Sequence, residues 1–164
     1  MIQRVQTILL VGVIICLGLM FFFPIWEKSN TQSGTMVSLD VYYLYEFKSA
    51  DAGSNEWFET SRKPVFYLAG LAGIAALMAL YVIFRYDKRP LQIMLNALNA
   101  FLIMALIGTM AYLIYEAENQ VGIQMKDSFK AGFFLPVGAL ALISFANRFI
   151  RKDEALVKSV DRIR

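Results

Sequence analysis

The chain has 164 residues, of which 58% are hydrophobic and only 18% are charged, and its mean hydropathy is +0.53. A typical soluble domain is nearer half apolar and a quarter charged, so this balance excludes a disordered chain and indicates an integral membrane protein. A single Cys excludes an internal disulfide, and the absence of His removes the commonest general base and transition-metal ligand. The net charge is +3, but the basic residues flank apolar runs and form no block, so we expect no nucleic-acid partner.

Four apolar segments are each long enough to cross a bilayer, whose core of about 30 Å takes roughly 20 helical residues. They cover residues 5–26, 64–84, 91–115 and 131–150. The first segment ends in bulky aromatic residues, which favours a retained anchor over a cleaved signal peptide. The sequence therefore predicts one all-α integral membrane domain, a four-helix transmembrane bundle. No Asp, Glu or Lys lies deep in a span, which argues against a proton-coupled pump or an intramembrane acid–base enzyme.

The distribution of basic residues predicts the orientation, because Lys and Arg are enriched in cytoplasmic loops. Ten of the sixteen Lys and Arg residues lie at the two ends of the chain or between the second and third spans. This places both termini in the cytoplasm. Aromatic residues at the span ends predict two interfacial belts. The outer belt contains Phe21, Phe22, Phe23, Trp26, Tyr67, Tyr112 and Tyr115, and the inner belt contains Phe84, Tyr86 and Phe149.

The outer loop at residues 27–63 carries a strand pattern. Residues 29–34 are turn-like, residues 37–47 alternate apolar and polar side chains with period two, residues 49–55 form a second turn, and residues 56–60 are a candidate returning strand. We therefore expect a small extracytoplasmic β-hairpin, either packed on the bundle or used to recognise a partner. The second outer loop, at residues 116–130, is short and polar, and its carboxylates show no metal-ligand spacing.

Polar amides form the first candidate functional cluster. Gln92, Asn96 and Asn99 follow one another at helical spacing, so they share one face of the third span, and Gln6, Thr7 and Asn147 are expected at a similar inner depth. One interpretation is interhelical hydrogen bonding that fixes the bundle. The alternative is a polar vestibule or a site for a ligand head group near the cytoplasmic side.

Two further sets are candidates for contacts. The second span carries small residues at small-xxx-small spacing, which let helices approach closely; they are Ala69 with Gly73, Ala72 with Ala76, and Ala75 with Ala79. The cytoplasmic tail at residues 151–164 has apolar residues at helical spacing and predicts a basic amphipathic helix that binds anionic lipid or a partner, unless it only fixes topology. Its basic residues, counted from the end of the fourth span, are Arg148, Arg151, Lys152, Lys158, Arg162 and Arg164.

Several local sequences together suggest a family. They are residues 1–7, residues 88–93 with 95–96 and 98–99, residues 134–136, and residues 147–148, 151–154, 157–159 and 161–164. In these segments the chain resembles the domain-of-unknown-function 4293 family of small four-span bacterial membrane proteins. The matching segments include residues in or beside every span, and the match is most specific in the tail. The resemblance implies a location in the bacterial inner membrane. It implies no activity.

These observations favour a non-enzymatic accessory or scaffold subunit of an inner-membrane complex, with the lipid bilayer and a membrane-protein partner or a second copy as its contacts. The alternative is a small lipid- or solute-handling membrane protein that uses the amide cluster. No phosphate-binding loop, dinucleotide fingerprint, zinc spacing or haem ligand occurs in the sequence, so we expect no cofactor. An enzyme is the third interpretation, because it would need a pair of outer-loop carboxylates that the spacing does not suggest.

Overall fold

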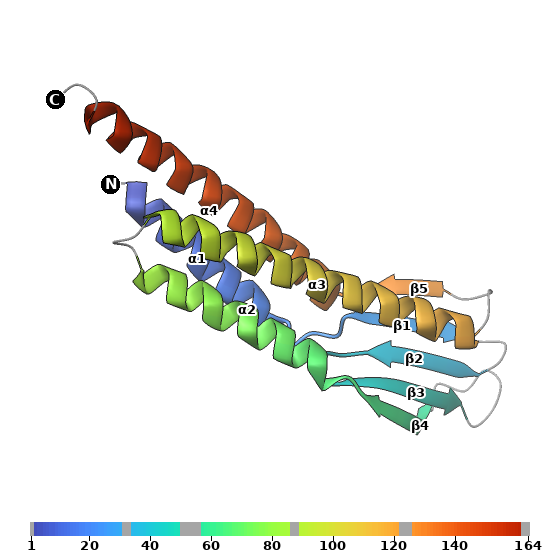
Figure 1. Cartoon of the computed structure of the whole chain (residues 1–164). Helices are drawn as coiled ribbons and strands as arrows, with labels where there is room; N and C mark the ends of the chain where they lie inside the picture. Colours follow the sequence, from blue (N-terminus) through green and yellow to red (C-terminus); the bar gives the residue numbers. More distant parts are fainter. Residues whose placement is uncertain (1, 31–33, 50–56, 86–88, 122–125, 162–164) are drawn as a thin grey trace.

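The computed structural model describes residues 2–30, 34–49, 57–85, 89–121 and 126–161. Within these residues the chain forms four helices and five strands (Figure 1). The helices are α1 (Ile2–Leu19), α2 (Phe66–Phe84), α3 (Arg89–Val121) and α4 (Ala131–Asp161). The strands are β1 (Trp26–Asn30), β2 (Thr35–Leu39), β3 (Tyr43–Ser49), β4 (Trp57–Pro64) and β5 (Lys126–Phe129).

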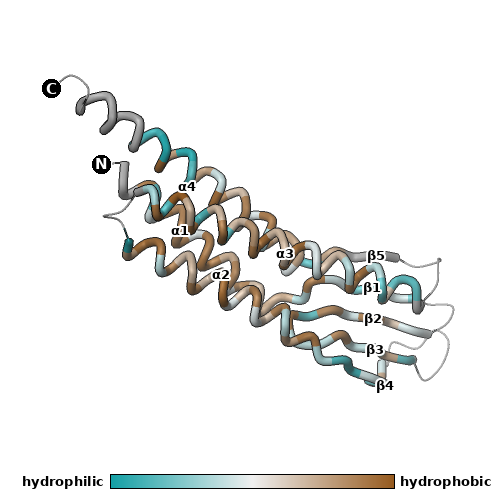
Figure 2. Tube along the Cα trace, viewed as in Figure 1, coloured by the Kyte–Doolittle hydropathy of each residue, from teal (hydrophilic) through white to brown (hydrophobic). Residues whose placement is uncertain are grey.

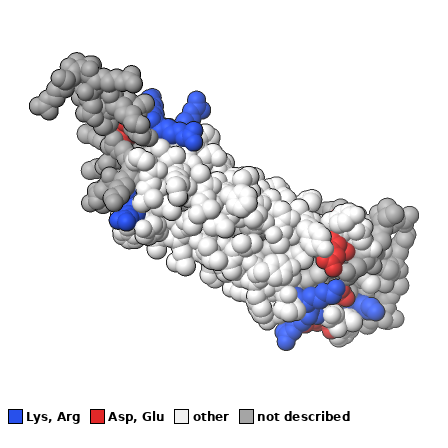
Figure 3. Space-filling view, in the orientation of Figure 1, with Lys and Arg blue, Asp and Glu red and all other residues white. Residues whose placement is uncertain are grey.

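The four helices form an up-and-down bundle with the sheet at one end. Helices α1 and α3 each pack against both α2 and α4. Helix α1 begins and α4 ends at the end of the bundle opposite the sheet (Figure 1). The helical part is coloured mostly hydrophobic in Figure 2, and Figure 3 shows a long uncharged surface between two charged ends. Such an apolar outer surface on a bundle is what contact with lipid requires.

Three of the helices are long and apolar enough to cross a membrane, over Phe66–Phe84, Pro90–Asn119 and Ala131–Asp153. The chain is therefore a membrane protein. The apolar helix at the start of the chain is shorter, covering Val5–Leu19. The prediction that the first span continues to residue 26 is wrong, because the helix ends at Leu19 and Trp26 begins a strand. Trp26 is fully buried, so it is not part of an interfacial belt.

The extramembrane part is larger than a hairpin. All five strands form one antiparallel sheet in the order β4-β3-β2-β1-β5. The predicted continuous strand at residues 37–47 is wrong, because the chain reverses between Leu39 and Tyr43, where the Asp40 amide donates to the Tyr43 carbonyl at 2.9 Å. The alternation of side chains continues through this turn, and no Gly or Pro marks it. The turn predicted at residues 29–34 starts too early, since β1 includes Ser29 and Asn30.

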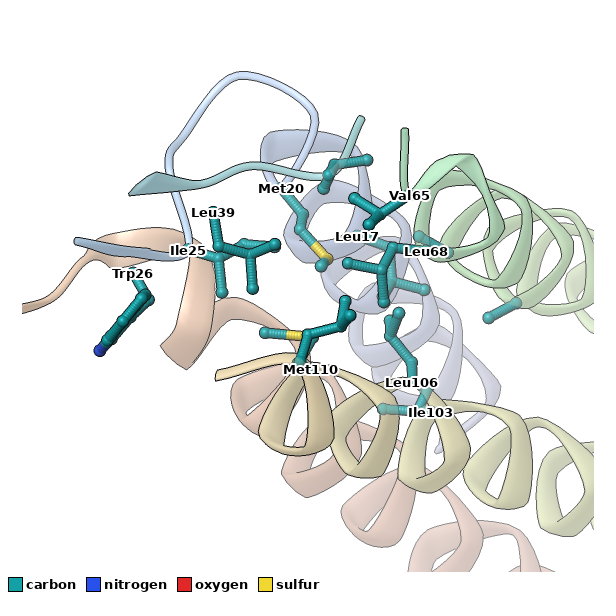
Figure 4. Close-up of a cluster of buried hydrophobic side chains, with 14 of the residues drawn as sticks. Leu17, Met20, Ile25, Trp26, Leu39, Val65, Leu68, Ile103, Leu106 and Met110 are labelled. Carbon is teal, nitrogen blue, oxygen red and sulfur yellow. The ribbon is translucent and has the colours of Figure 1, made fainter. Parts of the chain in front are cut away.

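The core of the bundle continues into the inner face of the sheet. In Figure 4, side chains from α1, α2 and α3 point toward one another and toward Ile25 and Leu39, the latter on β2. The fully buried members include Leu17, Leu68, Ile103 and Met110 from the helices, Met20 directly after α1, and Ile25, Trp26 and Leu39 from the sheet region. A shared core makes the sheet a rigid extension of the bundle and not a separate domain.

Candidate functional site

The inward face of α3 is polar at its start and apolar afterwards. Gln92, Asn96 and Asn99 are buried, and the two asparagines have no exposed surface. The same face continues with Ile103, Leu106 and Met110, which are also fully buried. The spacing of three and four residues keeps all of these positions on one side of the helix, facing the other three helices. The polar residues are therefore inside the bundle and do not face lipid.

In the part of the chain that the structure describes, one of these α3 amides has a protein partner and the other two do not. The side-chain nitrogen of Gln92 donates to the carbonyl of Val82, in the last turn of α2, at 3.0 Å. Among the described residues, neither the Nδ2 nor the Oδ1 atom of Asn96 or Asn99 has a hydrogen-bond partner. The Nε2 of Gln6 and the Oδ1 of Asn147 are likewise buried and unpartnered. Interhelical hydrogen bonding thus accounts for Gln92 and not for Asn96 or Asn99.

The amides divide the hydrophobic core into two clusters. The smaller cluster contains Leu10, Val82 and Ala146, with Leu95 packed against it. The fully buried members of the larger cluster begin nearer the sheet on each of these helices, at Val13, Ala79, Ile143 and Ile103. On α1, α2 and α4 the interval between the buried members of the two clusters is three residues, whereas on α3 the interval between Leu95 and Ile103 holds Asn96 and Asn99. We call these two asparagines the amide layer.

The remaining amides lie near the smaller cluster. Gln6 precedes Leu10 by one turn of α1, and Asn147 follows Ala146 and is half-buried. Side-chain amides carry both donors and acceptors and no charge, so the amide layer suits a small neutral polar group. A buried polar atom left without a hydrogen bond costs about 1–3 kcal/mol, so four such atoms are a strong reason to look for a function here.

Among the described residues, the charged groups lie away from the amide layer. In the described part of the chain, acidic and basic residues lie at the two ends of the molecule (Figure 3), and no three His, Cys, Asp or Glu residues are placed to hold a metal ion. The arrangement can bind and orient a polar group.

The small residues of α2 mainly face the interior of the same chain. Ala72, Ala75 and Ala79 are fully buried, and Ala69 and Ala76 are partly buried against the larger core cluster. A Cβ atom added to Gly73 would meet nothing within 4 Å. The small side chains therefore let α2 pack closely within its own bundle, and Gly73 marks no close contact.

The basic residues at the end of α4 occupy an exposed surface. Arg148, Arg151 and Lys152 are exposed, and they lie on the part of α4 that approaches the end of the bundle opposite the sheet (Figure 1). Helix α4 continues without a break from Ala131 through Pro136 to Asp161, so the tail, including the backbone of Lys158, extends the fourth helix. Arg162 and Arg164 lie outside the described residues.

Two features of the sheet region were not found from the sequence. Lys28 of β1 is buried and its Nζ lies 3.2 Å from Oε1 of Glu118 on α3, which joins the sheet to the last turns of that helix. The only sequence signal is the position of Lys28 two residues after Trp26, which puts both on the inner face of β1. The second feature is a hollow between the end of α1 and the outer face of the sheet, lined in part by Asp40.

Comparison with known families gives one match, to DUF4293, a domain of unknown function, over residues 2–163. The chain belongs to the DUF4293 family. The resemblance inferred from the terminal and inner-loop segments is confirmed, and the DUF4293 domain includes the bundle, the sheet and the amide layer together. A comparison with curated proteins gave no match.

Proposed function

We propose that this DUF4293 protein is a non-enzymatic accessory or scaffold subunit of a bacterial inner-membrane assembly. The observation that carries the proposal is the five-stranded sheet, which shares its core with the bundle and leaves β4 as an edge strand exposed along most of its length. An edge strand offers unpaired backbone groups to another chain, and a rigid support lowers the entropy lost on binding.

The arrangement of the helices supports a four-span topology within this proposal. Helix α1 has 18 residues, which corresponds to about 27 Å, and it packs along α2 and α4. If the three longer helices cross the bilayer, α1 crosses with them. The sheet is then extracytoplasmic and both termini are cytoplasmic, in agreement with the excess of Lys and Arg at that end.

The side chains of β4 favour binding of one specific partner. They disfavour non-specific pairing of this edge with strands of other molecules. Glu59 and Arg62 form an exposed ion pair at 3.9 Å, and charged residues on an edge strand oppose aggregation. Phe58 is 57% exposed on the same strand. An exposed aromatic residue beside charges is a common anchor in protein interfaces.

Co-purification in mild detergent tests the scaffold proposal. We expect the full-length protein to retain one or more membrane proteins, and Phe58→Lys to release them without lowering the melting temperature. Phe129→Lys is the matched control, because Phe129 lies on the opposite edge strand β5 and is 48% exposed. A lone monomer across several detergents, or release by Phe129→Lys alone, would contradict docking at β4.

A second candidate function is handling of a small lipid or solute at the amide layer, and the unpartnered, fully buried Asn96 and Asn99 favour it. We expect an Asn96→Ala/Asn99→Ala double variant to lose a copurifying lipid or solute that mass spectrometry detects with the unmodified protein. Thr109→Val is the control on the same helix, because the Thr109 hydroxyl is already satisfied by the Ala105 carbonyl at 2.7 Å. Equal retention by both variants would exclude this function.

A further inference from the structure

A hollow of about 270 Å³ lies where α1 meets the outer face of the sheet. One wall is the segment at residues 20–24, which follows α1 and contains three consecutive phenylalanines. The other lining residues are Glu27, Ser38 and Asp40, together with Val41 and Tyr42. The hollow thus joins an aromatic surface to a surface that carries two carboxylates.

The sheet geometry explains why these polar residues gather. Glu27 and Ser38 are directly opposite each other in the pairing of β1 with β2. Asp40 follows Ser38 by two residues, so the alternation of side chains directs both toward the outer face. The aromatic wall meets them through Phe21 and Tyr42, whose ring centroids are 6.0 Å apart.

The two carboxylates differ in their charge balance. Glu27 is paired with Lys130, whose Nζ lies 3.0 Å from Oε2 of Glu27. No hydrogen bond or ion pair is made by the Asp40 carboxylate in the described part of the chain. Asp40 is half-buried, and this burial raises the pKa of its carboxyl group. Among the described residues, the hollow therefore contains one carboxylate that forms no ion pair.

The position of the hollow indicates the source of a counter-ion. Phe22 and Phe23 are exposed next to it, at the end of an apolar helix, as expected for side chains at a membrane surface. A carboxylate beside aromatic rings is a suitable site for an ammonium group, which gains both an ion pair and a cation–π contact. When the sheet end of the bundle lies at the bilayer surface, lipid head groups are present beside this hollow at high local concentration.

We propose that the hollow between residues 20–24 and the sheet binds the ammonium head group of a zwitterionic phospholipid, with Asp40 as its counter-ion and Phe21 and Tyr42 as its aromatic contacts. The inference does not depend on the scaffold function, and it requires only that the sheet end of the bundle lies at the bilayer surface. A bound lipid there neutralises Asp40 and fills the junction between the bundle and the sheet.

Native mass spectrometry of the full-length protein tests this binding. The detergent-purified, delipidated protein is titrated with a short-chain phosphatidylethanolamine, with the matching phosphatidylglycerol, and with free ethanolamine. We expect preferential retention of phosphatidylethanolamine, and an affinity about three- to tenfold lower in Asp40→Asn, as expected for loss of one partly exposed ion pair. Glu46→Gln is the matched control, because Glu46 lies on β3 and does not line this hollow.

A second variant, Ser38→Lys, keeps the proposal testable if Asp40→Asn does not fold. Ser38→Lys places a tethered ammonium group opposite the aromatic wall, so we expect it to abolish the preference for phosphatidylethanolamine while the protein stays folded. Equal retention of the two phospholipids by the unmodified protein, or unchanged retention in both variants, would overturn the proposal. Competition by free ethanolamine at the same concentration as the lipid would assign the hollow to a soluble amine and would overturn the lipid assignment.

Discussion

The absence of one Cβ atom decides how closely α4 approaches the segment that follows α1. The Gly132 amide donates to the Pro24 carbonyl at 3.0 Å. A Cβ atom at Gly132 would lie 2.6 Å from that oxygen and 2.7 Å from the Phe23 carbonyl oxygen. Both obstructing atoms belong to the backbone, so a side chain fits only if the helix or the segment moves.

Gly132→Ala is therefore expected to destabilise the protein by about 1–3 kcal/mol, the usual cost of overpacking a close contact. Gly138→Ala is the control in the same helix, because an added Cβ there meets nothing within 4 Å. The control should be neutral or stabilising by up to about 1 kcal/mol. Thermal unfolding in one detergent measures both variants, and equal melting temperatures would show that the contact with residues 23–24 is not tight.

Asp40 gives a pH-dependent prediction. Burial raises the pKa of its carboxyl group above the ordinary value of 3.8, so the folded state holds this proton to higher pH than the unfolded state. The free energy of unfolding therefore falls as the pH rises from the pKa of Asp40 in the unfolded state to its pKa in the folded state. Below both pKa values Asp40 has no such effect on stability. In detergent without phosphatidylethanolamine, Asp40→Asn should raise the melting temperature at neutral pH, and the gain should vanish in acid. A constant difference at all pH values would contradict this origin.

At the scale of elements, α3 connects the membrane part with the sheet. Its 33 residues correspond to about 50 Å, which exceeds the bilayer core of about 30 Å, so its last turns rise beside the strands. Lys28 of β1 meets Glu118 in this extension, with side chains that are 8% and 35% exposed. The pair lies where the sheet packs on the helix and fixes their relative position.

A double-mutant cycle measures this connection. For Lys28→Met and Glu118→Gln we expect a coupling free energy of about 0.5–3 kcal/mol, because the pair is largely removed from water. The same cycle on Glu59 and Arg62, which are both exposed and 3.9 Å apart, should give no more than about 0.5 kcal/mol. Unfolding by denaturant in mixed micelles provides both values. Similar couplings in the two cycles would mean that Lys28 and Glu118 do not anchor the sheet.

The sequence predicted some helices and strands correctly and failed to predict others. The long apolar segments predict α2, α3 and α4, because hydrophobic length is a property of each segment alone. Strand β5 was missed, since its four residues are polar at three positions and it is stabilised by pairing with β1, about 100 residues earlier in the chain. The sequence predicted a two-stranded hairpin where the structure has a five-stranded sheet. The reason is the same, because strand pairing depends on neighbours that are distant in sequence.

At the scale of the whole molecule, the up-and-down order of the helices gives a topology test. Helix α1 begins and α4 ends at the end of the bundle opposite the sheet (Figure 1). In a Cys16→Ser background we expect Lys48→Cys, on the exposed part of β3, to react with a membrane-impermeant maleimide added to intact cells from which the outer membrane has been removed. Lys152→Cys, near the end of α4, should react only after the membrane is permeabilised. Labelling of both from the same side would contradict the four-span orientation.

The sequence by itself determined that this chain is a membrane protein, that Gln92, Asn96 and Asn99 share a helix face, and to which family the chain belongs. Each of these depends on composition, helical period or local motifs. Only the tertiary structure decided that this face points inward, that the small residues of α2 pack within the chain, and that Asp40 lines a hollow beside residues 20–24. These are relations between separate segments, and the free energy that selects them comes from burial of surfaces that no single segment contains.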